Sequence, residues 1–351
     1  MKFRFAVQVF WPGVAHLLGW AATRSRKAAK LMRKRWQFVL VIMFLAIAGE
    51  VAWQLLSPRE PLYQGKRLSQ WLQGYTAGTE SPEIDEAVRN IGTNAIPTLL
   101  RALRVNSSAT RKTISLPPLV RVDLEFVDIQ NMQAQKGFEA LGVEARAAVP
   151  ALIEIYEQNI CLSSQTGAAA ALAAIGPEAK SAIPSLILNT TNTSPAVRAV
   201  AVATLGEIHC EPERVVPALV QSLSDPDKEV RLFAAFSLRG FGGDARAAIP
   251  ALIEALKDPF NQVRGNAAWA LGEIHGQPEF AVPALVETLR DTNSLVRTRA
   301  ACALKKFGAD ARPAAKALVE LLDDPDEQVK DSAAQALRAI DPEAADKAGP
   351  R

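Results

Sequence analysis

The chain has 351 residues, of which 49% are hydrophobic and 6% aromatic, and its net charge is +3. A hydrophobic fraction of this size supports a packed core and excludes disorder for most of the chain. The charge is divided unevenly, because residues 1–36 hold nine basic and no acidic side chains whereas residues 37–351 hold 31 basic and 37 acidic ones. A body with a net charge of −6 lacks the excess of basic side chains that phosphate binding requires. Nucleic acid is therefore excluded as a partner.

The first predicted element is an apolar stretch over residues 36–56, directly after a cluster of basic side chains in residues 24–35. A helix needs about 20 mostly apolar residues to cross a bilayer, and flanking basic residues mark the side that stays in the cytoplasm. We therefore predict a basic cytoplasmic segment over residues 1–35, then a transmembrane helix or signal anchor over residues 36–56 that contacts the lipid bilayer. The protein would be single-pass in the cytoplasmic (inner) membrane, with its N-terminus cytoplasmic and the rest exported to the periplasm.

A cleaved signal peptide is the alternative for the same stretch. Ala46-Ile47-Ala48 resembles a cleavage site, and a chain that starts at Met32 rather than Met1 would have a short basic leader before the apolar core. The protein would then be secreted after cleavage. Both interpretations export residues 57–351.

A linker and a capping helix are predicted over residues 57–82. The apolar side chains of Leu68, Trp71, Leu72 and Tyr75 share one face at helical spacing. Such a face can cover the open end of whatever the chain builds next.

A 33-residue repeat fills residues 83–341, as seven complete units and a terminal half-unit. Each unit has a turn with an Asp, a Val-Arg pair and a proline-led apolar run such as Ile249–Leu252. The unit predicts two helices, one from Gln262 to Leu271 that Gly272 should end, and a second that begins near Pro283. Neither helix can bury its apolar stripe alone, so stacked units predict an all-α fold, an elongated α-solenoid.

The 33-residue period of the repeat is interrupted by one longer step, and a further similarity appears at twice this period. One step is 53 residues long, which leaves an insertion at about residues 105–135. Within it Val120–Phe126 alternates as a strand does, although a longer helix pair fits equally well. The block 194–259 is echoed by 260–325, because Leu205–His209 recurs as Leu271–His275. The last residues, 342–351, are predicted to be a frayed tail.

The columns Asp-Pro-x-x-x-Val-Arg, Ala-Ala-x-Ala-Leu-Gly and Ile-Pro-Ala-Leu-Ile-Glu resemble HEAT repeats, in particular the short bacterial HEAT-like units of phycocyanobilin-lyase-type proteins. The resemblance covers residues 83–341 and implies a right-handed, armadillo-like α-solenoid. It also implies a structural ladder between neighbouring repeats, built from the turn Asp and the helix Arg. The matching residues are Asp225, Arg231, Asp258, Arg264, Asp291 and Arg297.

A second resemblance lies ahead of the repeats. The stretch Tyr63–Leu72, which reads Tyr-x-Gly-Lys-x-Leu-x-x-Trp-Leu between an apolar segment and HEAT-like units, resembles uncharacterised exported proteins of Verrucomicrobia and Planctomycetes. It implies no activity.

The sequence contains no recognisable motif of catalytic residues. Three scattered cysteines are too few for a disulfide framework or a cysteine-rich zinc site, and His209 and His275 fall two repeats apart, too far to share one metal ion. Phosphate-loop, dinucleotide, zinc-protease and nucleophile-elbow motifs do not occur. We therefore predict no enzyme, no metal site and no cofactor. The alternative is an enzyme on a HEAT-like scaffold, either phycobilin-lyase-like or a metal-dependent hydroxylase.

Surface recognition is the function that remains. The resemblance implies that the second helices line the concave side, where a polar stripe would follow the proline-led runs. We predict a membrane-anchored scaffold that binds a protein or peptide partner through this concave face, although a merely solvated face is the alternative. The candidate surface residues are Gln221, Glu254, Lys257, Trp269, Glu287, Arg290 and Glu320.

Overall fold

The computed structural model describes residues 60–75, 81–104, 114–116, 120–122 and 126–348. Glu60–Arg351 forms one compact unit, separate from Met1–Arg59. The predicted segments 1–35 and 36–56 lie outside the described residues, and so does the start of the predicted linker.

A short hairpin and a helix open this unit. Strands β1 (Leu62–Tyr63) and β2 (Lys66–Arg67) pair antiparallel, and both turn residues between them have positive φ, as a tight two-residue hairpin requires. Helix α3 (Leu68–Leu72) follows and buries Leu68 and Leu72. Tyr75 is buried as well, and its hydroxyl donates a 2.5 Å hydrogen bond to Asp85 of the next helix. These residues cover the first helix pair, the position for which the sequence predicts a cap.

Pairs of short helices make up most of the rest of the unit. The helices are α4 (Pro82–Ile91), α5 (Ile96–Leu103), α6 (Phe126–Leu141), α7 (Val149–Gln158), α8 (Leu162–Ile175), α9 (Ile183–Asn189), α10 (Pro195–Ile208), α11 (Pro212–Ser222), α12 (Lys228–Gly240), α13 (Ile249–Ala255), α14 (Asn261–Ile274), α15 (Pro278–Thr288), α16 (Ser294–Phe307), α17 (Ala315–Glu320), α18 (Glu327–Ile340) and α19 (Pro342–Ala348). Short 3₁₀ turns join most pairs, at η1 (Gly92–Ala95), η3 (Gly142–Ala148), η4 (Gly176–Ala182), η5 (Gly242–Ala248) and η6 (Gly308–Ala314), and η7 (Leu321–Asp323) follows α17. The predicted all-α solenoid is confirmed.

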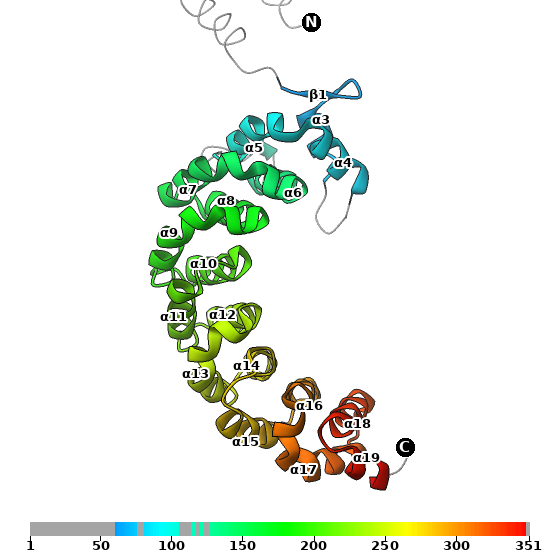
Figure 1. Ribbon diagram of the computed structural model, residues 1–351. Coiled ribbons are helices and arrows are strands. Elements are labelled where there is room, and N and C mark those ends of the chain that lie inside the picture. Colours follow the sequence, from blue (N-terminus) through cyan, green and yellow to red (C-terminus); the bar gives the residue numbers. More distant parts are fainter. Residues whose placement is uncertain (1–59, 76–80, 105–113, 117–119, 123–125, 349–351) are drawn as a thin grey trace, which may run out of the picture. The chain divides into compact units, whose positions relative to one another are not determined.

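The pairs stack in register and form two layers (Figure 1). The Val-Arg helices α10, α12, α14, α16 and α18 contact one another in succession, and the proline-led helices α9, α11, α13, α15 and α17 lie behind them. One apolar core runs along the stack between the layers, as expected when no single pair can bury its own stripe.

The stack curves, and the Val-Arg helices lie on its inner side (Figure 1). This corrects the expectation that the proline-led second helices line the concave face. The reason is the size of the side chains between helices. Gly206 of α10 faces Ser237 of α12, and Gly272 of α14 faces Ala303 of α16, so closely that an added Cβ would lie under 3 Å from them. Small residues let the inner helices approach more closely than the outer ones, and the stack bends toward them.

Two helix ends differ from the sequence prediction. Gly272 does not end its helix: α14 continues to Ile274 and is capped by His275, which has φ +46°. Pro283 does not begin α15, because that helix starts at Pro278 and holds Pro283 within it. The same arrangement occurs one block earlier, where His209 caps α10 and α11 holds Pro217. The doubled period of the sequence is therefore a real alternation between two kinds of turn.

The insertion contains a hairpin and part of a helix. Strands β3 (Ile114–Leu116) and β4 (Val120–Val122) pair antiparallel, so the alternating sequence is a strand at its start. Helix α6 begins at Phe126 and leads back into the repeats. At the other end, residues 342–348 form helix α19, although a frayed tail is predicted there.

The predicted single-pass location in the cytoplasmic membrane, with the lipid bilayer as partner, is corrected. Across the part of the chain that the structure describes, no helix is long and apolar enough to cross a bilayer. The longest helix there, α6, has 16 residues, about 24 Å in length against a hydrocarbon core of about 30 Å. The segment 36–56, on which the prediction rested, lies outside the described residues.

Candidate interaction surface

An Asp–Arg ladder links four successive repeats. Nε and Nη2 of one arginine donate to both carboxylate oxygens of the aspartate in the following turn, at distances of 2.6–3.1 Å. The pairs are Arg198–Asp225, Arg231–Asp258, Arg264–Asp291 and Arg297–Asp324. Partners are thus 27 residues apart, in neighbouring repeats.

The six-residue spacing seen in the sequence has its own role. Nη1 of Arg231 donates a 2.9 Å hydrogen bond to the main-chain carbonyl of Asp225, six residues earlier in the same repeat. The carboxylate of Asp225 meanwhile accepts a bond from the backbone N–H of Asp227. One arginine therefore fixes its own turn through a carbonyl and the next turn through a carboxylate.

The electrostatics of the ladder are those of a satisfied structural network. Burial raises the pKa of Asp225, but the hydrogen bonds from Arg198 and from the Asp227 backbone outweigh burial and leave that pKa below its ordinary value. The hydrogen bond to Asp225 raises the pKa of Arg198. A fork of this kind matches guanidinium to carboxylate geometry and leaves little capacity for a ligand.

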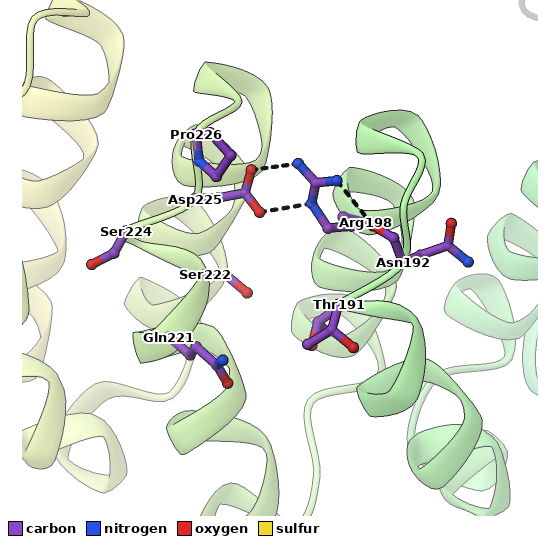
Figure 2. A pocket seen from close by; sticks show the side chains of 9 residues that line it. Thr191, Asn192, Arg198, Gln221, Ser222, Ser224, Asp225 and Pro226 are labelled. Carbon is purple, nitrogen blue, oxygen red and sulfur yellow. Dashed lines mark hydrogen bonds and ion pairs between the residues drawn. The ribbon is translucent and has the colours of Figure 1, made fainter.

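Figure 2 shows the cavity beside the first rung of the ladder. It has a volume of about 440 Å³ and is lined mostly by hydroxyl and amide side chains of the turns around α9, α10 and α11. Arg198 and Asp225 point toward each other across it, so its two charges are already paired. Gln221 is exposed at its rim.

The predicted surface residues do not form one site. Six of them lie on or just after the proline-led helices, in the outer layer: Gln221, Glu254, Lys257, Glu287, Arg290 and Glu320. Among these, Lys257 pairs with Glu254 at 3.3 Å and Arg290 with Glu320 at 3.8 Å, and all four side chains are more than half exposed. Exposed pairs of this kind contribute little to stability. Trp269, on α14, is the one residue of the predicted set that belongs to the inner layer.

Trp269 is the centre of a cation–π cluster across three repeats. The guanidinium carbon of Arg239, on α12, lies 4.0 Å from the centre of the Trp269 ring and 4.4 Å from that of Phe236. The guanidinium carbon of Arg299, on α16, lies 5.2 Å from the Trp269 ring. We call Phe236, Arg239, Trp269 and Arg299 the arginine–aromatic cluster.

Hydrogen bonds fix the position of the cluster. Trp269 donates from Nε1 to Glu273 at 3.0 Å, and the other oxygen of Glu273 accepts a 2.6 Å bond from Lys306. Arg299 donates a 2.6 Å bond to the buried amide oxygen of Asn266. Trp269 and Arg299 are thus held in place before any partner arrives.

The two arginines of the cluster differ from those of the ladder in their charge balance. Within the described part of the chain, neither Arg239 nor Arg299 forms a salt bridge with a carboxylate. Burial lowers the pKa of Arg299, and the nearby charge of Arg239 lowers it further. Two guanidinium groups in one partly buried place, with a single carboxylate already bound to Lys306, leave a local positive charge.

The two layers carry opposite charge around this cluster. Apart from the ladder arginines, helices α12, α14, α16 and α18 hold seven basic and four acidic side chains, a net charge of +3. Helices α11, α13, α15 and α17 hold two basic and five acidic side chains, a net charge of −3. The small overall charge of the chain hides this polarity between the layers.

Sequence reasoning singled out Trp269 but missed its arginine partners. Arg239 and Arg299 stand at different positions of the 33-residue unit, so no repeat column connects them. The sequence does contain one signal. Phe236 and Trp269 occupy the same position in successive repeats, and the same position in other repeats holds Ala203, Cys302 and Gln335.

Metal chemistry finds no geometric support in residues 60–75, 81–104 and 126–348. The side chains placed there contain no group of three His, Cys, Asp or Glu residues that could hold a metal ion. His209 instead stacks on Phe241 of the next repeat, with 4.6 Å between ring centres, and His275 lies tilted against Phe307 at 5.0 Å.

Comparison with known proteins identifies the repeat. The family model for HEAT repeats matches residues 183–252 and 249–338. These ranges contain the ladder and the arginine–aromatic cluster. Residues 183–338 are therefore HEAT repeats.

A search of curated proteins gives no match, whereas a search of solved structures does. Kap121p bound to Pho4p is 16% identical with a TM-score of 0.50, over 77% of this chain and 30% of Kap121p. An engineered protein is 26% identical with a TM-score of 0.44, over 57% of this chain and 97% of its own. A chain of the complex of CpcE and CpcF of phycocyanin lyase from Nostoc sp. is 24% identical with a TM-score of 0.37. The match covers 45% of this chain and 98% of that one.

Proposed function

We propose that this protein is a scaffold that binds a protein partner along the inner, concave face of its HEAT-repeat solenoid. The observation that carries the proposal is the arginine–aromatic cluster, which is partly exposed on the inner layer and in which hydrogen bonds hold Trp269 and Arg299. Aromatic and arginine side chains in this state are the residues that most often dominate binding energy at protein interfaces.

The fold supports the same proposal. Stacked repeats present a long surface that a partner can follow, and the structural relative Kap121p has been solved with Pho4p bound. The repeats supply the surface, and the side chains on it supply the specificity.

Site-specific photo-crosslinking in the producing cell tests the proposal. A photoreactive phenylalanine analogue is placed at Phe236 on the inner layer, which is 40% exposed, or at Val319 on the outer layer, which is 38% exposed. We expect one protein to be crosslinked from Phe236 and not from Val319.

The crosslinked protein is then purified and its binding measured with the unlabelled chain. Binding must be lost on Trp269→Ala and retained on Val319→Ala. Equal crosslinking from both positions, or a partner whose affinity is unchanged by Trp269→Ala, would contradict the proposal.

A further inference from the structure

We propose that the inner face recognises an extended acidic segment of its partner, with Arg239 and Arg299 as the receptors for carboxylate side chains. The inference rests on the proposed function and adds the chemistry of the partner. Its starting point is that the guanidinium carbons of Arg239 and Arg299 lie 4.0 and 5.2 Å from the centre of the Trp269 ring, and that neither side chain is paired with a carboxylate within the described residues.

The cluster is built to receive carboxylates rather than only to pack. A guanidinium group in contact with a ring can still donate from its remaining N–H groups to the two oxygens of a carboxylate, and Arg299 commits Nη1 to Asn266. In the ladder, four arginines of the same fold each donate two hydrogen bonds to an aspartate carboxylate, with N···O distances of 2.6–3.1 Å. The two cluster arginines have the donors of the ladder arginines without an aspartate to bind.

Further basic side chains extend the surface along the stack. Lys305 of α16 lies beside Gln335 of α18, to which it donates a 3.1 Å hydrogen bond, and Arg338 is exposed on α18. These positions follow the cluster toward the C-terminal repeats. A segment of about 12 extended residues, about 40 Å long, is enough to pass four inner helices spaced about 10 Å apart.

The negative net charge of the rest of the molecule favours a peptide over a nucleic acid as the partner. The body has a net charge of −6 and its outer helices are acidic, so a long polyanion meets repulsion beyond the inner face. Glu273 also stands within the cluster, bonded to Trp269 and Lys306. A peptide can place separate carboxylates on either side of Glu273, whereas a continuous phosphate backbone cannot avoid it. Phe236, 40% exposed beside Arg239, offers an apolar contact to the same segment.

The test uses the full chain and three fluorescent peptides of about 12 residues. The acidic probe contains Glu, Ser and Gly with one central Phe, and the two comparison probes replace every Glu by Gln or by Lys. We expect the acidic probe to bind at least about tenfold more tightly than either comparison probe in fluorescence anisotropy, with an affinity that falls as salt is raised.

Two pairs of substitutions with the same charge change locate the binding. Arg239→Gln with Arg299→Gln should weaken the acidic probe by about tenfold or more, whereas Arg312→Gln with Lys316→Gln, both exposed around the outer layer, should change it by less than about twofold. Circular dichroism monitors folding. If the first pair does not fold, Lys305→Gln with Arg338→Gln replaces it, because both of these side chains are exposed.

The outcomes separate this inference from the proposed function. Equal binding of the acidic and Gln probes, equal loss in the inner and outer variants, or tighter binding of a single-stranded oligonucleotide would overturn the acidic-segment inference. Crosslinking from Phe236 but not Val319 would in that case still support a concave interface with a partner of other chemistry.

Discussion

At the scale of single residues, one side-chain type has two different uses. The ladder arginines, such as Arg297, are paired with aspartates and hold turns together. Arg239 and Arg299 instead lie against Trp269. The difference is whether a turn aspartate of the next repeat lies within reach, which depends on the position of the arginine in the 33-residue unit. Position in the unit therefore separates structural arginines from those available to a partner.

The ladder predicts how stability depends on pH. The hydrogen bond from Arg297 lowers the pKa of Asp324 against the effect of burial, and the pKa values of Asp225 and Asp291 are also lowered. Because the folded-state pKa lies below the unfolded value of about 3.9, this stabilisation is complete above that pH and is lost as the pH falls through the folded-state value.

We expect Asp324→Asn to lower the free energy of unfolding by about 1.5–3 kcal/mol at pH 7, because the carboxylate accepts two hydrogen bonds from Arg297. At pH 3 the difference from the wild-type chain should be smaller, because the aspartate of the unfolded chain, with a pKa of about 3.9, then binds a proton more readily than that of the folded chain. Urea unfolding followed by circular dichroism at both pH values measures this. Asp310→Asn, at an exposed position, is the control. A difference of the same size at pH 3 and pH 7 would argue against the ladder as its source.

At the scale of the helices, glycine and alanine on the facing sides of the inner layer decide how the stack curves. A Cβ atom added to Gly272 would lie only 2.7 Å from the Cα of Ala303. The sequence suggested a helix stop at this glycine because glycine often ends helices. Its neighbour across the helix interface, 31 residues later in the chain, shows that close packing is the actual reason for it.

Gly272→Ala should therefore destabilise the protein although alanine favours helices more than glycine does. We expect a loss of about 1–3 kcal/mol from forced separation of α14 and α16. Gly243→Ala is the matched control, because its added methyl group meets nothing within 4 Å and its φ is not positive, so its stability should stay level or rise slightly. Thermal unfolding of both variants measures the contrast, and a stabilised Gly272→Ala protein would mean that the two helices are not held this closely.

At the scale of the whole repeat array, stability should behave as a sum over neighbouring units. Helix α18 covers the last complete pair and buries Val329, Ala333, Leu337 and Ile340 against it. Its exposed face is polar, with Glu327 and Asp331, which suits a terminal element.

A chain cut after residue 325 should keep the helicity of its remaining pairs but unfold at lower urea concentration, because the cut exposes the apolar side of α16 and α17. A chain cut after residue 341 loses only α19 and should change much less. Circular dichroism at increasing urea compares the two. An unchanged midpoint in the shorter chain would show that α18 does not close the array.

The sequence by itself determined the repeat and its helix pairs. Six ladder residues were implied by the resemblance to HEAT repeats, and Arg198 and Asp324 were not among them. A period of 33 residues with aligned proline, Asp, Val-Arg and Leu columns has few other structural solutions, because each pair can bury its stripe only against the next. The sequence also marked Trp269 as a candidate surface residue. These features follow from the local sequence pattern, so they do not depend on the direction in which the stack curves.

The tertiary structure alone decided which layer is concave, and with it which surface can meet a partner. Curvature depends on the distance between helices that are a full repeat apart, as between Gly272 and Ala303, and no local pattern contains that distance. Packing across three repeats likewise brought Arg239 and Arg299 to the two sides of Trp269. In three dimensions, the charged side chains of helices α11 to α18 other than the ladder arginines are thus divided between a basic inner layer and an acidic outer one.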